Sequence, residues 1–178
     1  MGKGTDSMWE GRHNYHLNSA TVLQDVYRLL STVMGDRAVM DAAAGSDDRL
    51  RTLRNQFIED ELVHLLVATA VANRIQLEHM AGPRNDPDEL SYSPLVHECG
   101  QLQQDVSVLH RIPLTFREAC NKIIHAEAIV AQTTGVPEET PVGTIVALRG
   151  RLRQVTWLAH LDVVAYARGA VRNFEDGL

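Results

Sequence analysis

The sequence predicts a mainly α-helical fold, a bundle of about four to five helices with a small C-terminal β-hairpin. Long segments repeat apolar residues at the three- and four-residue spacing of an amphipathic helix. Residues that favour helix caps stand at the starts of these segments. A clear alternation of apolar and polar residues, rich in β-branched side chains, is found only near residues 143–160.

Length and composition are those of one globular domain. The chain has 178 residues, 44% hydrophobic and 22% charged. We expect residues 1–17, which are polar and glycine-rich, to form an irregular arm, and residues 18–178 to form a single helical domain. The net charge of -6 argues against a broadly basic nucleic-acid-binding surface and leaves a local basic patch open.

The expected location is the cytoplasm. The two cysteines are too few for a disulfide framework and are expected to be free thiols in a reducing compartment. The opening "MGKGTDSMWEGRH" lacks the apolar core of a signal peptide. No apolar run approaches the roughly 20 residues of a membrane span, so we expect no membrane partner.

The first helix is predicted over residues 18–35. Asn18 or Ser19 can cap its start, and Gly35 can end it. Its apolar residues recur at helical spacing: Val22, Val26, Leu29, Leu30 and Val33.

A long second helix is predicted over residues 46–82. Ser46 or Asp47 can cap it, acidic residues in its first turn suit the helix dipole, and the Gly82–Pro83 pair stops it. Its expected core face is Leu50, Leu53, Phe57, Leu65, Ala68, Ala72 and Ile75.

Residues 95–110 fit a helix or a strand, and both readings stay open. The next helix is better marked. Thr115 and Glu118 in "TFRE" form a capping-box pattern, which predicts that the helix begins near Phe116.

The C-terminal part predicts two strands and a helix. "TIVALRG" and "RQVTWLAHL" both alternate, which predicts a hairpin around Gly150. Asp162 can then cap a final helix over residues 163–174. A single helix over residues 152–174 is the competing interpretation.

A polar column on the predicted helix after Thr115 is the main functional pattern. Arg117, Asn121 and His125 follow one another at four-residue intervals, so a continuous helix would align them in one stripe. Arginine suits phosphate, and histidine transfers protons near neutral pH. The alternative is that the stripe is only the solvated face of an amphipathic helix, on which Glu118 pairs with Lys122.

The stretch "LTFREACNKIIHA" resembles the motif helix of the HEPN superfamily. Asn121, three intervening residues and His125 match the asparagine–histidine half of its pattern. Cys120 stands where the family has its arginine, and Arg117 lies one turn earlier. The resemblance implies a small helical protein, often a dimer, and for many members a metal-independent ribonuclease of toxin–antitoxin or phage-defence systems.

Three residues of the long second helix are candidates to support the motif. In HEPN-like proteins a polar residue of the preceding helix often does so, and Asp60, Glu61 or His64 could fill that role; the alternative is a solvated charged patch. Glu61 and His64 also fit Glu-x-x-His, but a di-iron site needs a second copy on another helix, and the predicted helices carry only this one. We therefore expect no metal and no cofactor.

Two function hypotheses from different classes follow. The first is a metal-independent ribonuclease in which His125 is the general acid or base at the 2′-hydroxyl, Arg117 stabilises phosphate charge, and Asn121 orients one of them. The second is a non-catalytic dimer that binds RNA or a protein partner such as an antitoxin. The basic clusters "RLRTLR", residues 49–54, and "RGRLR", residues 149–153, could contact an RNA backbone. A homodimer formed partly by the motif helices is expected.

Overall fold

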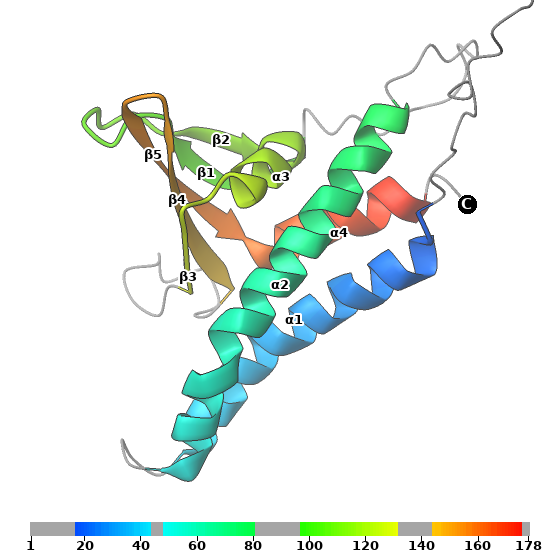
Figure 1. Ribbon diagram of the computed structural model, residues 1–178, viewed down its shortest axis with the longest axis vertical. Helices are drawn as coiled ribbons and strands as arrows, with labels where there is room; N and C mark the ends of the chain where they lie inside the picture. Colours follow the sequence, from blue (N-terminus) through cyan, green and yellow to red (C-terminus); the bar gives the residue numbers. More distant parts are fainter. Residues whose placement is uncertain (1–16, 44–47, 81–96, 132–143, 176–178) are drawn as a thin grey trace, which may run out of the picture.

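The fold is α+β, with a five-stranded antiparallel sheet packed against helices (Figure 1). A computed structural model describes residues 17–43, 48–80, 97–131 and 144–175. The elements in chain order are α1 (Ser19–Ala42), α2 (Arg49–Met80), β1 (Glu98–Gln103), β2 (Ile112–Thr115), α3 (Phe116–Ile124), β3 (Ala128–Ala131), β4 (Ile145–Leu152), β5 (Val155–Asp162) and α4 (Val163–Glu175).

The prediction of a helical bundle with only a small C-terminal hairpin is wrong. The strands β4 and β5 do pair as a hairpin, but they belong to a sheet with the order β2-β1-β5-β4-β3. The strand β1 adds to β5, with Gly100 opposite Leu161. The extra strands carry weak sequence patterns, since β2 and β3 have four residues each and β1 contains a glycine and two glutamines.

The helix α1 begins as predicted and ends later than predicted. The side chain of Asn18 accepts a hydrogen bond from the Thr21 amide at 3.3 Å, which confirms the cap. Gly35 does not end the helix, which continues to Ala42. A glycine inside a helix costs about 1 kcal/mol relative to alanine, and this long helix tolerates it.

The helix α2 extends beyond the sheet, and for this reason part of its predicted core face is exposed. Leu65 and Ala72 are buried, but Leu50, Leu53 and Phe57 are 45%, 55% and 55% exposed. The end of α2 that carries them projects beyond the sheet beside α1 (Figure 1), so within the described part of the chain it has no third layer to pack against.

The start of α2 also differs in part from the prediction. The predicted caps Ser46 and Asp47 lie outside the described residues, as does the predicted arm apart from Leu17. Asp48 accepts a hydrogen bond from the Leu50 amide at 2.8 Å. The first turn of α2 contains no acidic residue, contrary to the prediction.

One face of the sheet joins the helices in a single core. The inward side chains of the strands form one apolar cluster with residues of all four helices; on the strands these are Cys99, Leu102, Leu114, Val146, Leu148, Trp157, Ala159 and Leu161. The intervening residues point to the other face, where Arg149 is exposed and His160 is half-buried. No described helix covers this second face of the sheet.

The junction of α3 and α4 is tightly packed. The Phe116 ring is fully buried, 5.5 Å from the Tyr166 ring and 6.2 Å from the His97 ring between centroids. A Cβ added at Gly169 would lie 2.5 Å from Phe116 Cδ2, so only glycine allows this approach. Asp162 caps α4 as predicted, accepting from the Val164 and Ala165 amides.

Two alternatives left open by the sequence are resolved. Of the residues described between 95 and 110, Glu98–Gln103 form a strand. The single helix over residues 152–174 is excluded, because β5 extends to Asp162 and α4 begins only at Val163.

Candidate functional site

The motif helix α3 begins as predicted but is too short to carry the whole polar column. Thr115 accepts a hydrogen bond from the Glu118 amide at 3.4 Å, which confirms the cap. The helix ends at Ile124, and His125 is its C-cap, with φ -105° and ψ 12°. The chain then turns into β3. Arg117 and Asn121 therefore lie on the same face of α3, whereas His125 lies just beyond the end of the helix.

The three column residues have separate surroundings. Arg117 is exposed and has no hydrogen bond or ion pair within the described ranges. The Asn121 amide donates to Glu118 at 3.3 Å, and Glu118 also pairs with Lys122 at 3.2 Å. The Lys122 ammonium lies 4.6 Å from the centre of the Trp157 ring. The Asn121 amide group therefore hydrogen-bonds to the Glu118 carboxylate. It was expected to orient Arg117 or His125 instead.

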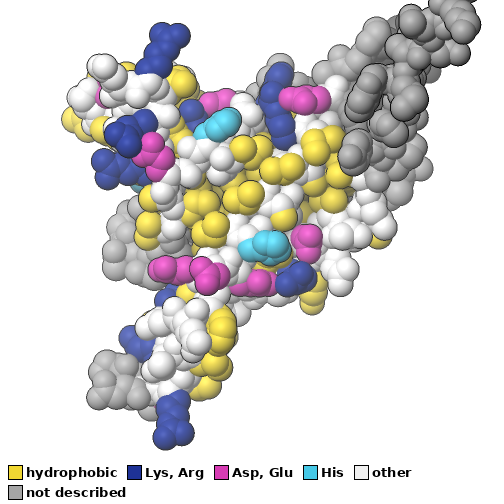
Figure 2. All heavy atoms as spheres, in the orientation of Figure 1, with side chains coloured by type: hydrophobic (Ala, Val, Ile, Leu, Met, Phe, Trp, Pro, Cys, Tyr) yellow, Lys and Arg dark blue, Asp and Glu magenta, His cyan; other side chains and the backbone are white. Residues whose placement is uncertain are grey.

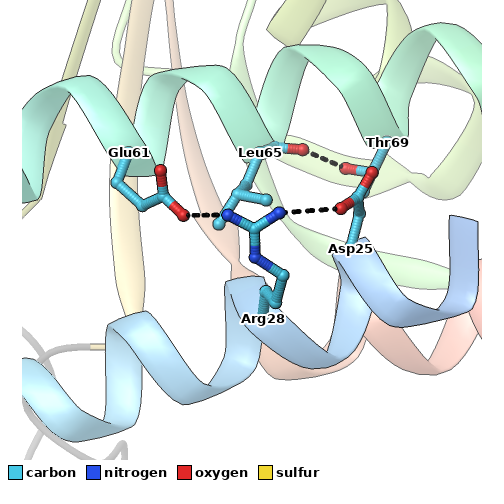
Figure 3. A network of polar contacts seen from close by, with 5 residues as sticks. All are labelled: Asp25, Arg28, Glu61, Leu65 and Thr69. Carbon is cyan, nitrogen blue, oxygen red and sulfur yellow. Dashed lines mark hydrogen bonds and ion pairs between the residues drawn. The ribbon is translucent and has the colours of Figure 1, made fainter. Parts of the chain in front are cut away.

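Among the described residues, no hydrogen bond or ion pair joins the candidate supporting residues of α2 to α3. Glu61 pairs with Arg28 of α1 at 2.7 Å, and Arg28 also reaches Asp25 at 3.3 Å (Figure 3). Asp60 and His64 are exposed, with no hydrogen bond or ion pair in the described part of the chain. No group of three potential metal-binding side chains occurs among the described residues.

The fold brings the end of the motif helix next to the second basic cluster. A Cβ added at Gly150 would lie 2.8 Å from the carbonyl oxygen of His125. The Glu127 amide donates to the Arg149 carbonyl at 2.8 Å, and Ala128 pairs with Arg149 in the sheet. Sequence reasoning missed this neighbourhood, because β3 is short and its pairing with β4 leaves no local pattern.

Several exposed arginines lie on the open face of the sheet or at its edge, near the end of α3. We call Arg111, Arg149, Arg151 and His160, together with Arg153 in the adjoining turn between β4 and β5, the basic sheet face. All four arginines are exposed, and "RGRLR" is at a hairpin end as predicted. Glu127 pairs with Arg151 at 3.1 Å. Arg149 and Arg153 have no ion pair with any residue that the structure describes.

The remaining members of the basic sheet face lie on β5 and just before β2. Arg111 donates to the Gln101 side chain at 3.3 Å, and Gln101 stands opposite His160 in the sheet. Burial, with a smaller effect of Arg111, lowers the pKa of His160. A neutral imidazole on this face can donate or accept a hydrogen bond.

The first basic cluster is partly neutralised. Arg54 forms a two-pronged contact with Asp36, with nitrogen–oxygen distances of 2.5 and 2.8 Å. This pair raises the pKa of Arg54. The guanidinium of Arg54 is therefore neutralised by Asp36, and this ion pair links α2 to α1.

The thiols are not candidate nucleophiles. Cys99 and Cys120 are buried and free. Burial raises the pKa of Cys120 to about 12 and also raises that of Cys99, so both remain protonated at neutral pH.

Comparison with known proteins gives no family, since no family model, no curated protein and no solved structure matches the chain. Within the described ranges, no helix combines the length and apolar character needed to cross a membrane.

Proposed function

We propose that the chain is a non-catalytic RNA-binding protein that holds the phosphate backbone on its basic sheet face. The observation that carries the proposal is the exposure of Arg149, beside the end of the motif helix, and of Arg153, in the turn between β4 and β5, both without ion pairs among the described residues. Guanidinium groups bind phosphate oxygens in a fixed fork. The resemblance of that helix to HEPN proteins favours RNA over DNA as the ligand.

Binding without cleavage suits the geometry of α3. The Asn121 amide is held by Glu118, and His125 lies beyond the last helical turn. General acid–base catalysis needs the acid or base within hydrogen-bond reach of the reacting group and oriented toward it. Among the described residues, no side-chain hydrogen bond orients the imidazole of His125.

A metal-independent ribonuclease of a toxin–antitoxin or phage-defence system is the second candidate. It is favoured by the exposure of His125 next to the arginines of β4. In this reading His125 transfers the proton of the 2′-hydroxyl and Arg117 stabilises charge on the phosphate. A cytoplasmic location, a homodimer and an antitoxin-like protein partner belong to the same proposal.

The binding test is fluorescence anisotropy of a labelled single-stranded RNA over a series of salt concentrations. Replacing Arg149→Gln and Arg153→Gln together removes two cations from the basic sheet face. Each lost phosphate contact should reduce the log–log salt slope by about 0.7 and weaken binding at low salt. The matched control is Arg168→Gln, which removes an exposed cation from α4 in the helical layer. An equal loss in the control, or no binding by wild type at low salt, contradicts the proposal.

Cleavage of the same RNA separates the two candidates. Wild type that binds but leaves the RNA intact supports the non-catalytic reading. If wild type cleaves, His125→Ala should slow cleavage about 10²- to 10⁴-fold, because a positioned proton donor or acceptor is lost. Arg117→Ala should also slow it, and EDTA should have little effect. Cleavage that survives His125→Ala rules out the ribonuclease mechanism.

A further inference from the structure

The exposed face of α2 carries an apolar stripe interrupted by two polar residues. We call Leu53, Phe57, Asp60, His64, Val67 and Val71 the α2 stripe. At about 100° per residue these positions fall on one side of the helix, roughly opposite the buried Leu62, Leu65 and Thr69. The four apolar members are 55%, 55%, 36% and 41% exposed in chain order. A helix face turned away from the core is normally polar.

The stripe borders further apolar surface. A groove of about 390 Å³ lies between α1 and the first turns of α2, lined by Val39, Leu53 and Phe57 among others. Figure 2 shows hydrophobic side chains over the middle of the molecule, where α2 runs in Figure 1, and again along the projecting end. Contiguous exposed apolar side chains are typical of interaction sites.

Several charged side chains beside the stripe are paired within the chain. Arg28 pairs with Asp25 and Glu61, as Figure 3 shows, and Arg54 pairs with Asp36. The chain as a whole carries a net charge of -6, so two copies repel each other at a distance. Pairing of the charges beside the stripe reduces the local repulsion when two copies meet through this surface.

We propose that the α2 stripe binds the α2 stripe of a second copy, with the two helices antiparallel about a two-fold axis near residue 62. In a two-fold interface, when residue i meets residue j, residue j also meets residue i. Asp60 of each copy then faces His64 of the other, in two equivalent contacts. An imidazole N–H donates to a carboxylate whether the ring is neutral or charged.

The same register matches the apolar residues. Phe57 meets Val67 of the second copy, and Leu53 meets Val71. The stripe spans 53–71, about 27 Å of helix at 1.5 Å per residue. A parallel arrangement would instead set Asp60 beside Asp60, which is repulsive. The charge pattern of the two central positions therefore selects the antiparallel pair.

This association places the projecting end of α2 beside the sheet-backed half of the partner helix. The exposed Phe57 side chain, which has no third layer in its own copy, gains one from the other. The surface is on α2 and is separate from the basic sheet face, so the dimer does not depend on RNA binding.

Sedimentation velocity on the full chain tests the surface. Wild type should sediment as a dimer at tens of micromolar, the order expected for an interface of ordinary strength. Phe57→Arg and Val67→Arg should each raise the dimer dissociation constant at least tenfold, because they put a charge into an apolar contact. The control Leu109→Arg places the same charge on a residue that is 101% exposed and lies off the stripe, and should leave the dimer intact. Monomeric wild type, or a dimer that survives Phe57→Arg, overturns the proposal.

Exchange of the central charges tests the register. Asp60→Lys alone sets a cation against His64, and His64→Glu alone sets a carboxylate against Asp60, so each should weaken the dimer. The double variant restores opposite charges and should recover it. Failure of the double variant to recover the dimer overturns the antiparallel register. Loss of the dimer with RNA binding retained would separate this inference from the proposed function.

Discussion

Replacing Gly169 by alanine should destabilise the protein, although the same change usually stabilises a helix. Alanine is favoured over glycine by about 1 kcal/mol inside a helix. At Gly169 the added Cβ would lie 2.5 Å from Phe116 Cδ2 and 2.9 Å from His97 Cδ2. The Phe116 ring cannot retreat, because it is fully buried and packed against Tyr166.

The size of the effect follows from these two opposing contributions. Forcing extra volume into a packed core costs about 1–3 kcal/mol, and the fully buried Phe116 ring places this site at the upper end. After subtraction of the propensity gain, Gly169→Ala should lower the free energy of unfolding by about 1–2 kcal/mol. For a chain of this size the melting temperature should fall by roughly 2–8 °C.

Gly35 provides a matched control within the same chain. It lies inside α1, and a Cβ added there would meet no atom within 4 Å. Gly35→Ala should therefore raise the free energy of unfolding by about 0.4–1 kcal/mol. Both variants can be measured by urea denaturation followed by circular dichroism. If Gly169→Ala is as stabilising as Gly35→Ala, the close packing of α4 on Phe116 is refuted.

Two further predictions concern the cap of α3 and the thiols. Thr115→Ala should lower the free energy of unfolding by about 1 kcal/mol, measured by urea denaturation, because the Glu118 amide loses its acceptor; Thr115→Ser should retain most of the stability, and equal losses in both variants would contradict the role of the hydroxyl. Cys99 and Cys120 should react with an aromatic disulfide reagent at pH 8 only after unfolding in guanidinium, because burial raises the pKa of both thiols. Rapid labelling of the native protein would contradict their burial.

Local signals in the sequence predicted the ends of several elements. The caps at Asn18, Thr115 and Asp162 are confirmed by their hydrogen bonds. They could be predicted because the side-chain acceptor and its amide donor lie within three residues of each other in the sequence. The hairpin of β4 and β5 was also recognised, since both strands are eight residues long and alternate.

The sheet as a whole was not predicted, because it depends on distant pairing. Whether β1 is a strand is decided by its position beside β5, with Gln101 opposite His160 and Leu102 opposite Ala159. Its own sequence, "ECGQLQ", has little β-propensity. Tertiary context therefore determined this element.

The candidate site was predicted as residues but not as an arrangement. Four-residue spacing aligns Arg117, Asn121 and His125 only if the helix continues, and α3 ends at Ile124. The proximity of His125 to Arg149 arises from the pairing of β3 with β4. Such a neighbourhood cannot be seen in a window of local sequence. The catalytic and supporting roles assigned to these residues stay predictions.

The strand order has a consequence for how the protein folds during synthesis. In the middle of the sheet, β1 pairs with β5, which are the first and the last strand in the sequence. The strands β1 and β2 therefore leave the ribosome well before β5 is made. Before β5 emerges, the strands can form only the separate pairs β1–β2 and β3–β4, and each pair would leave free the edge that β5 later occupies. A free strand edge can recruit a strand from another molecule. Because long-range pairing is slow, this interval is when the nascent chain is most exposed to aggregation. Arrival of β5 closes both edges at once and turns two fragments into one cooperative unit.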